Sequence, residues 1–128
     1  MKTAIVTGAA SGIGLATTRQ LVEAGYRVHA VDRAEDGLSR ESKNHDSSSF
    51  IPHVGDVSDE QLWSSLSTSV DGQVDVLVHN AFALHLKPLH LQTKDEWTLQ
   101  WEVMVGAVFY SVAHLHDALL SASGSMVL

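Results

Sequence analysis

The sequence predicts an α/β fold, a doubly wound parallel sheet with helices on both faces. Short apolar runs of β type occur at residues 3–6, 27–31, 50–54 and 74–78, and segments of helix length separate them. Alternating strands and helices are typical of parallel sheets that are buried on both faces. A glycine-rich turn between the first apolar run and a helical pattern supports the same fold. With 128 residues, of which 45% are hydrophobic, the chain has the length of one domain.

The first element is a strand that runs into three glycines, Gly8, Gly12 and Gly14, within KTAIVTGAASGIG. Gly8 suits a tight turn, Gly12 lets the main chain approach a pyrophosphate, and Gly14 permits close packing of the following helix. That helix, expected over residues 13–24, directs its free N–H groups at the phosphates. The stretch therefore predicts a dinucleotide site.

Asp32 ends the second apolar run, eighteen residues beyond Gly14. A carboxylate at this distance typically accepts hydrogen bonds from the adenosine ribose, and it repels the additional phosphate of NADP. We therefore expect NAD in preference to NADP. Arg33 offers a guanidinium that could pair with a 2′-phosphate if Asp32 moved away. The alternative interpretation of Asp32 is a solvated carboxylate in a turn.

The middle of the chain carries further helix signals. Residues 34–49 are polar and predict a weak helix or a loop before the third strand. Ser58 with Gln61, and Thr93 with Glu96, have the spacing of capping boxes and predict two helix starts.

One long helix is expected to follow Thr93, because apolar residues recur there every three or four positions. This apolar stripe faces either the sheet or another subunit, and its two tryptophans are expected in the core. Gly124 is expected to end the helix, and residues 125–128 to begin a fifth strand. The stripe consists of Trp97, Trp101, Met104, Val108, Val112, Leu115 and Leu119.

Composition disfavours several classes of partner. The net charge of −7 opposes binding of nucleic acid, which is recognised through many lysines and arginines. No apolar run of membrane-spanning length and no signal-peptide pattern is apparent, so we expect a soluble cytoplasmic protein without a membrane partner. The absence of cysteine removes disulfides and thiolate chemistry.

Eight histidines raise the possibility of a metal site, but none of their spacings matches an established ligand pattern. His114 and His116 are two residues apart and point to different sides of a helix. We therefore expect no metal. A nucleoside-triphosphate loop is also disfavoured, because no Lys-Ser or Lys-Thr pair follows the glycines.

The sequence TGAASGIG, residues 7–14, resembles the TGxxxGxG motif of the short-chain dehydrogenase/reductase family. Asp56 and Val57 in GDVSD resemble the family pair that contacts adenine, and Asn80 and Ala81 resemble the middle of its NNAG motif. The resemblance extends along all 128 positions. It implies a Rossmann-type sheet of order 3-2-1-4-5 and an NAD-dependent oxidoreductase acting on an alcohol or ketone. The cofactor-binding residues it implies, together with those from the glycine pattern, are Gly8, Ser11, Gly12, Ile13, Gly14, Asp32, Asp56, Val57, Asn80 and Ala81.

Three departures from the family pattern bear on catalysis. Phe82 replaces the glycine of NNAG, close to where the nicotinamide is expected. Met104 stands at the position of an asparagine that holds a proton-relay water, and a thioether cannot donate a hydrogen bond. The catalytic serine and the YxxxK pair of the family are absent from the sequence. We therefore expect residues 1–128 to be one NAD(P)-binding domain of a truncated enzyme, without catalytic residues and inactive alone.

Two alternatives stay open at this point. The chain could be a nucleotide-binding pseudoenzyme, consistent with Met104, or a methyltransferase, since those enzymes also combine a glycine loop with an acidic residue after the second strand. The long helix over residues 93–121 resembles the dimer helix of the family and predicts a possible homo-oligomer.

Overall fold

The computed structural model describes all 128 residues and contains one parallel sheet of five strands. The strand order is β3-β2-β1-β4-β5, which confirms the predicted fold class and strand order. Each pair of neighbours runs parallel, as the crossover helices require. The strands are β1 (Thr3–Thr7), β2 (Arg27–Asp32), β3 (Phe50–Val54), β4 (Val76–Val78) and β5 (Ser125–Val127).

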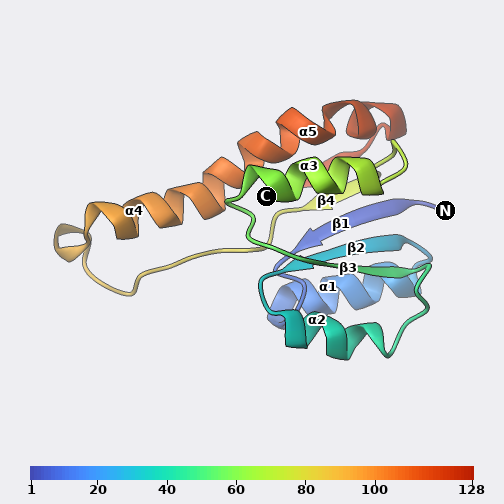
Figure 1. Cartoon of the computed structure of the whole chain (residues 1–128), viewed down its shortest axis with the longest axis horizontal. Coiled ribbons are helices and arrows are strands. Elements are labelled where there is room, and N and C mark those ends of the chain that lie inside the picture. Colours follow the sequence, from blue (N-terminus) through green and yellow to red (C-terminus); the bar gives the residue numbers. More distant parts are fainter.

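Helices cover both faces of the sheet. Figure 1 shows α1 (Gly12–Glu23) and α2 (Glu35–Ser42) on one face, with α3 (Glu60–Ser69) and α5 (Ala107–Ala122) on the other. The polar segment predicted as a weak helix or loop thus contains the two-turn helix α2. A 3-10 turn, η1 (Leu89–Leu91), and the short helix α4 (Lys94–Trp101) lie between β4 and α5.

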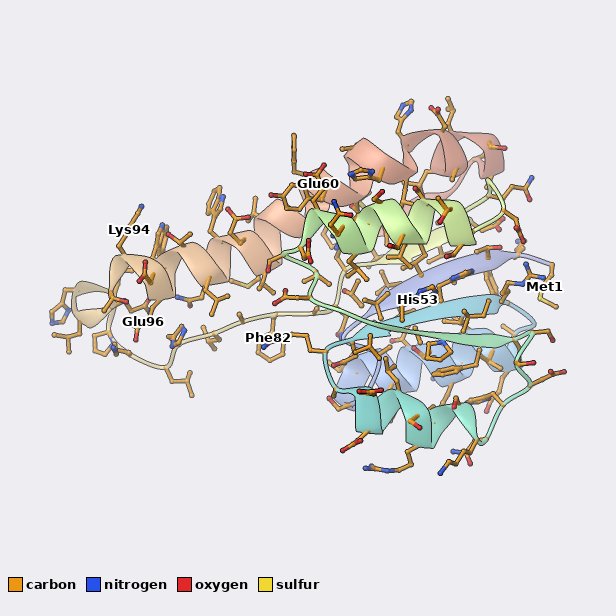
Figure 2. The ribbon with its side chains drawn as sticks, viewed as in Figure 1. Met1, His53, Glu60, Phe82, Lys94 and Glu96 are labelled. Atoms are coloured by element: carbon orange, nitrogen blue, oxygen red, sulfur yellow. The ribbon has the colours of Figure 1, made fainter.

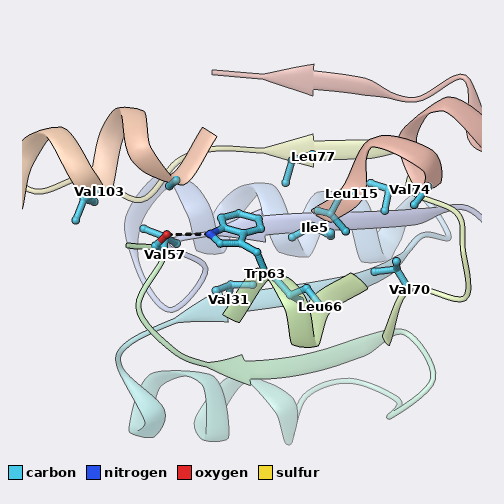
Figure 3. Close-up of a cluster of buried hydrophobic side chains, with 12 residues drawn as sticks. Ile5, Val31, Val57, Trp63, Leu66, Val70, Val74, Leu77, Val103 and Leu115 are labelled. Carbon is cyan, nitrogen blue, oxygen red and sulfur yellow. Dashed lines mark hydrogen bonds between the residues drawn. The ribbon is translucent and has the colours of Figure 1, made fainter. Parts of the chain in front are cut away.

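Each face of the sheet has its own hydrophobic core. Alternate residues of β1 point to opposite faces, so Ile5 joins one buried cluster while Ala4 and Val6 join the other. The larger cluster lies between the sheet and helices α3 and α5, and Figure 3 shows Trp63 at its centre. All five residues of β1 are buried, which is typical of a central parallel strand.

The predicted long helix is interrupted and only partly buried. A π-helical segment, η2 (Glu102–Gly106), joins α4 to α5. Figure 1 shows α4 extending away from the sheet. Trp97 is 46% exposed and Trp101 is 52% exposed, so the expectation that both lie in the core is wrong. Of the predicted stripe only Leu115 is buried, and the residues that join the core are instead Val103, Ala107, Leu115 and Ala118.

One of the two predicted capping boxes is present. The hydroxyl of Thr93 accepts from the backbone N–H of Glu96 at 3.1 Å, and the carboxylate of Glu96 accepts from the N–H of Thr93 at 2.9 Å. The other is wrong, because α3 is capped by Asp59, which accepts from the N–H of Gln61 at 2.9 Å. The hydroxyl of Ser58 instead donates to Asp56.

The end of α5 differs in detail from the expectation. Ser123 caps the helix in the left-handed conformation at φ 51°, one residue before the glycine expected to end it. Gly124 has a different use, since a Cβ there would collide with the carbonyl oxygen of Val74. Its missing side chain therefore lets the chain enter β5 close to β4.

The helical stretch Lys94–Ala122 is 29 residues long, with a mean hydropathy of 1.4 in its most apolar window. Length and composition alone therefore permit a membrane span that the sequence analysis did not expect. One such stretch is weak evidence, because core helices pass the same test. Here Val103, Ala107 and Leu115 belong to the buried cluster against α3, which accounts for part of the apolar character.

Candidate cofactor site

The turn after β1 needs glycine for two different reasons. Gly8 has φ +66°, and a Cβ on it would lie 2.6 Å from Nδ2 of Asn80. Gly14 has an ordinary φ, but its Cβ would collide with the carbonyl oxygen of Gly8. The first turn of α1 therefore packs directly on the end of β1, as predicted from the glycine spacing.

The N-terminus of α1 opens onto free space. Ser11 occupies the N-cap position, but its side chain makes no capping hydrogen bond, and the first turn contains no acidic residue. Gly12 has φ +54° and no heavy atom lies within 4 Å of the position a Cβ would take. A helix start with unpartnered amides and open space before it suits an anion such as a pyrophosphate.

Asp32 is fixed at the end of β2 by two backbone amides. Its Oδ2 accepts from the N–H of Ala10 at 2.9 Å, and its Oδ1 accepts from the N–H of Ala34 at 2.9 Å. The carboxylate thus bridges the glycine turn and the residues after β2. Each oxygen keeps a second lone pair for another donor. This geometry argues against the alternative interpretation of a freely solvated turn residue.

Asp56 and Val57 follow β3. Oδ1 of Asp56 accepts from the backbone N–H of Ser58 at 2.9 Å and from its hydroxyl at 2.7 Å. Burial raises the pKa of Asp56, but these two hydrogen bonds and the charge of Arg33 outweigh it and hold the pKa below its usual value. The carbonyl of Val57 accepts from Nε1 of Trp63 at 2.8 Å, the dashed line in Figure 3, so the loop is anchored to the core.

Asn80 and Ala81 follow β4 and are tied to β1 through Thr7. Both backbone N–H groups donate to Oγ1 of Thr7 at 3.0 Å, and Nδ2 of Asn80 donates to the carbonyls of Thr7 and Gly8 at 3.1 and 3.3 Å. Thr7 is fully buried. Sequence reasoning missed this threonine as a structural centre of the site, although it stands directly before Gly8 in the quoted motif.

These segments surround one cavity of about 450 Å³, within the usual range for ligand sites. Nine of the ten predicted cofactor residues line it, and Gly14 does not, since it packs against the turn behind. The cavity therefore lies at the carboxyl ends of β1, β2, β3 and β4, where open α/β sheets bind ligands. The additional lining residues are Val31, Arg33, Gly55, Phe82, Ala83 and Val103.

A second cavity of about 590 Å³ adjoins the first and shares Asn80, Ala81, Phe82 and Val103 with it. Its walls are mainly apolar and include Met104. Phe82, labelled in Figure 2 on the segment after β4, is 74% exposed, so its ring is not packed into the core. This places an aromatic ring where the two cavities meet.

His79 is the one ionisable residue that lines the second cavity. Its Nε2 lies 2.9 Å from Oγ of Ser111, which itself donates to the carbonyl of Val108 at 2.8 Å. Burial lowers the pKa of His79 to about 4. The ring is therefore neutral near pH 7 and braces β4 against α5.

The histidines gather no metal-binding set. The structure contains no group of three or more histidine or acidic side chains placed to share an ion. His114 instead lies 2.9 Å from Glu60, and His116 lies 2.8 Å from Asp117.

The glycine turn, the anchored acid and the position of the cavity are all features of dinucleotide-binding enzymes. A family model described as short chain dehydrogenase matches residues 2–128. The chain belongs to the short-chain dehydrogenase family. This membership supports an oxidoreductase class and a nicotinamide dinucleotide cofactor, and nothing in it supports the methyltransferase alternative.

Individual relatives agree with the family. The chain is 41% identical over 99 residues to a probable NADP-dependent dehydrogenase of Haemophilus influenzae, matching 74% of this chain and 39% of that protein. It is 34% identical over 128 residues to a tropinone reductase homolog of Arabidopsis thaliana, matching 95% of this chain and 41% of that protein. The chain thus spans less than half the length of these curated relatives.

Solved structures share the fold. A short-chain dehydrogenase from Streptomyces avermitilis superposes with a TM-score of 0.88 at 26% identity, over 98% of this chain and 47% of that one. An alcohol dehydrogenase from Thermococcus sibiricus, complexed with 5-hydroxy-NADP, superposes with a TM-score of 0.87 at 30% identity, over 98% and 56%.

Proposed function

We propose that this chain is the cofactor-binding part of an NAD-dependent oxidoreductase that transfers hydride between a nicotinamide and an alcohol or ketone. The observation that carries the proposal is the pairing of a free helix start at Gly12 with the anchored carboxylate of Asp32 on one cavity. The amides receive the pyrophosphate and the carboxylate receives the ribose hydroxyls. The bound dinucleotide supplies the hydride acceptor or donor.

The other predicted residues take roles around these two contacts. Gly8, Ser11 and Ile13 border the pyrophosphate, and Asp56 with Val57 borders the adenine. Asn80 and Ala81 border the ribose of the nicotinamide. All of these residues line the same cavity, which supports the assignment.

The preference for NAD rests on the immobility of Asp32. Both of its oxygens are held by backbone amides, so the carboxylate stays where a 2′-phosphate of NADP would meet its charge. Two relatives point the other way: the Haemophilus influenzae protein is named as NADP-dependent, and the Thermococcus sibiricus structure holds an NADP derivative. The choice between the cofactors is therefore the first quantity to measure.

Binding of NADH and NADPH by titration calorimetry tests the proposal. We expect tighter binding of NADH, and in Asp32→Ala a weaker affinity for NADH with a smaller difference between the two ligands. Gln73→Ala, at an exposed position remote from the cavity, is the matched control and should leave both affinities unchanged. A folded protein that gives no heat with either ligand would falsify the proposed function.

The catalytic step needs a proton donor or acceptor within hydrogen-bond reach of the substrate oxygen. The 128 residues contain no YxxxK pair, and Met104 offers no donor. We therefore propose that the chain by itself binds the dinucleotide without turnover. A pseudoenzyme remains the second candidate, favoured by Met104 in the lining of the second cavity, where the family pattern has an asparagine. Fusing the chain to the segment of a relative that carries the catalytic serine and the YxxxK pair distinguishes the two proposals. The fusion should oxidise alcohols if the oxidoreductase proposal holds and should stay inactive if the chain is a pseudoenzyme.

The long helical stretch supports a further proposal, a homo-oligomer through residues 93–121. Trp97 and Trp101 expose 46% and 52% of their surface on α4, which lies away from the sheet. Burial of exposed aromatic rings is favourable, so association with a second copy of the chain would be stabilised by covering these two side chains. Sedimentation velocity compares the double variant Trp97→Ser/Trp101→Ser with the wild type. We expect the variant to be shifted toward the monomer. A wild type that is monomeric at high concentration contradicts the proposal.

A further inference from the structure

Arg33 and Asp56 lie close together in the lining of the cavity that also contains Asp32. Arg33 follows β2 and Asp56 follows β3, and both line the cavity. Nε of Arg33 lies 3.8 Å from Oδ2 of Asp56. The guanidinium is thus paired with a carboxylate from the neighbouring strand end, and its partner is not the adjacent Asp32.

The backbone fixes this arrangement. Asp32 pairs in register with Val54, and the ladder continues one step further, where the N–H of Gly55 donates to the carbonyl of Asp32 at 3.0 Å. Asp56 comes next, with Oδ1 occupied by the two donors of Ser58. Its Oδ2 is therefore the oxygen left to face Arg33.

The two side chains differ in exposure to solvent. The side chain of Arg33 is 75% exposed, whereas that of Asp56 is 35% exposed and held by Ser58. The anion attracts the exposed cation beside it, although water weakens the attraction. With Asp32, the three side chains carry a net charge of −1 at this end of the cavity.

We propose that Asp56 is a specificity-determining residue that holds Arg33 away from the 2′-phosphate of NADP, so that preference for NAD depends on Asp56 as well as on Asp32. The inference rests on the proposed function. The contact through Nε draws the guanidinium toward Asp56 and lowers its net attraction for a phosphate, and the carboxylate also repels the phosphate directly. Without Asp56, Arg33 is free to receive the phosphate and the local charge becomes zero.

Binding of ADP-ribose and 2′-phospho-ADP-ribose to the full chain tests this inference. Both ligands lack the nicotinamide, so the surroundings of Phe82 do not affect the comparison. In Asp56→Asn we expect the ratio of affinities to move about two- to fivefold toward the 2′-phosphorylated ligand, the range for an exposed ion pair. Asp56→Ser, which keeps an acceptor for the amide of Ser58, should shift the ratio in the same direction and guards against misfolding.

The matched control is Arg33→Met, alone and combined with Asp56→Asn. If Arg33 receives the phosphate, the gain from Asp56→Asn shrinks in the double variant. If the wild type binds ADP-ribose but the ratio of affinities is unchanged in each folded Asp56 variant, this inference is overturned and the proposed function is not. A gain of equal size with and without Arg33 also overturns it. Failure of the folded wild type to bind either ligand overturns the proposed function and this inference together.

Discussion

Asn80 holds the glycine turn to the end of β4 through Thr7. Its Nδ2 donates to the carbonyl of Thr7 at 3.1 Å, while its own backbone N–H donates to Oγ1 of the same residue at 3.0 Å. The two residues are 73 positions apart in sequence, so this contact joins the first and fourth strands where the cavity opens. The site is therefore built on a brace between strands as well as on a loop.

Replacing this donor by an acceptor should loosen the brace. Asn80→Asp places a carboxylate against the carbonyl oxygens of Thr7 and Gly8, and we expect a loss of about 1–3 kcal/mol in the free energy of unfolding. Dinucleotide affinity should fall as well, because the turn is no longer fixed. Urea unfolding and NADH titration measure the two effects. Gln73→Glu makes the same chemical change at an exposed position, and an equal loss there contradicts the role of the brace.

Substitution should distinguish Gly14, which is needed for folding, from Gly12, which is needed for binding the dinucleotide. Gly14→Ala puts a methyl group against the carbonyl of Gly8, so we expect a large loss of stability, about 2 kcal/mol or more. Gly12→Ala meets only open space and strains a φ of +54°, for which about 1 kcal/mol is expected, while NADH affinity falls because the methyl enters the cavity.

Gly25→Ala is the matched control for the strain. Its φ is +87°, a Cβ there also meets nothing, and it lies outside the cavity. We expect a stability loss similar to that of Gly12→Ala with no change in NADH affinity. If the Gly12 variant binds as well as the Gly25 variant, the helix start is not where the pyrophosphate sits.

The sequence was sufficient to predict the local geometry of the glycine turn and the place of Asp32 at the end of β2. Three residues are recognisable from the sequence alone, because backbone conformation requires Gly8 and Gly12 and the end of the second strand positions Asp32. Thr7 and the pairing of Arg33 with Asp56 could not be read, since they depend on contacts across neighbouring strands. The predicted capping box of Ser58 with Gln61 failed for a related reason. The hydroxyl of Ser58 has two possible partners in a short turn, and in the folded loop it donates to Asp56.

The helix after Thr93 shows the limit of periodicity. Apolar spacing predicts which residues share a face, but it does not say what covers that face. Here the buried residues are Val103, Ala107, Leu115 and Ala118, and Trp97 and Trp101 on α4 are exposed. The π-helical segment at 102–106 has no signal in the apolar pattern, yet it contains Met104 and Val103, which line the second cavity.

Acid should destabilise the fold through two histidines. Burial, with the neighbouring charges of His53 and Arg27, lowers the pKa of His29 to about 4, and burial lowers that of His79 to about 4. The unfolded chain titrates near the ordinary value of 6.5. Stability is therefore full above pH 6.5 and falls as the pH drops toward 4, because only the unfolded state binds the protons. Each ring contributes a slope of up to about 1.4 kcal/mol per pH unit.

Urea unfolding at about pH 7.5 and about pH 5 measures this slope. Nδ1 of His29 lies 2.9 Å from Nε2 of His53, while Nε2 of His29 is buried without a partner. A proton on that nitrogen would be an uncompensated buried donor. In His29→Gln we expect a shallower pH dependence, whereas His116→Gln, at an exposed position, should keep the slope of the wild type. Equal slopes in all three proteins contradict the assignment.

The buried carboxylate of Glu41 holds α1 to α2, on the face of the sheet opposite α3 and α5. Glu41 accepts from Nε and Nη2 of Arg19 at 2.8 and 2.7 Å and lies 2.7 Å from Nε2 of His45. The hydrogen bond from Arg19 outweighs burial, and with His45 it lowers the pKa of Glu41 to about 2. The carboxylate is thus charged at neutral pH and depends on its partners.

Removing one partner leaves that charge buried. In Arg19→Met we expect a clear loss in the free energy of unfolding at pH 7, because the carboxylate of Glu41 is 6% exposed and loses both hydrogen bonds from the half-exposed Arg19. Arg27→Met is the matched control, because its partner Asp71 is 77% exposed and the pair should contribute less than about 1 kcal/mol. Thermal or urea unfolding of the two variants decides the comparison. Equal losses would mean that water reaches Glu41 and that its ion pair behaves as a surface contact.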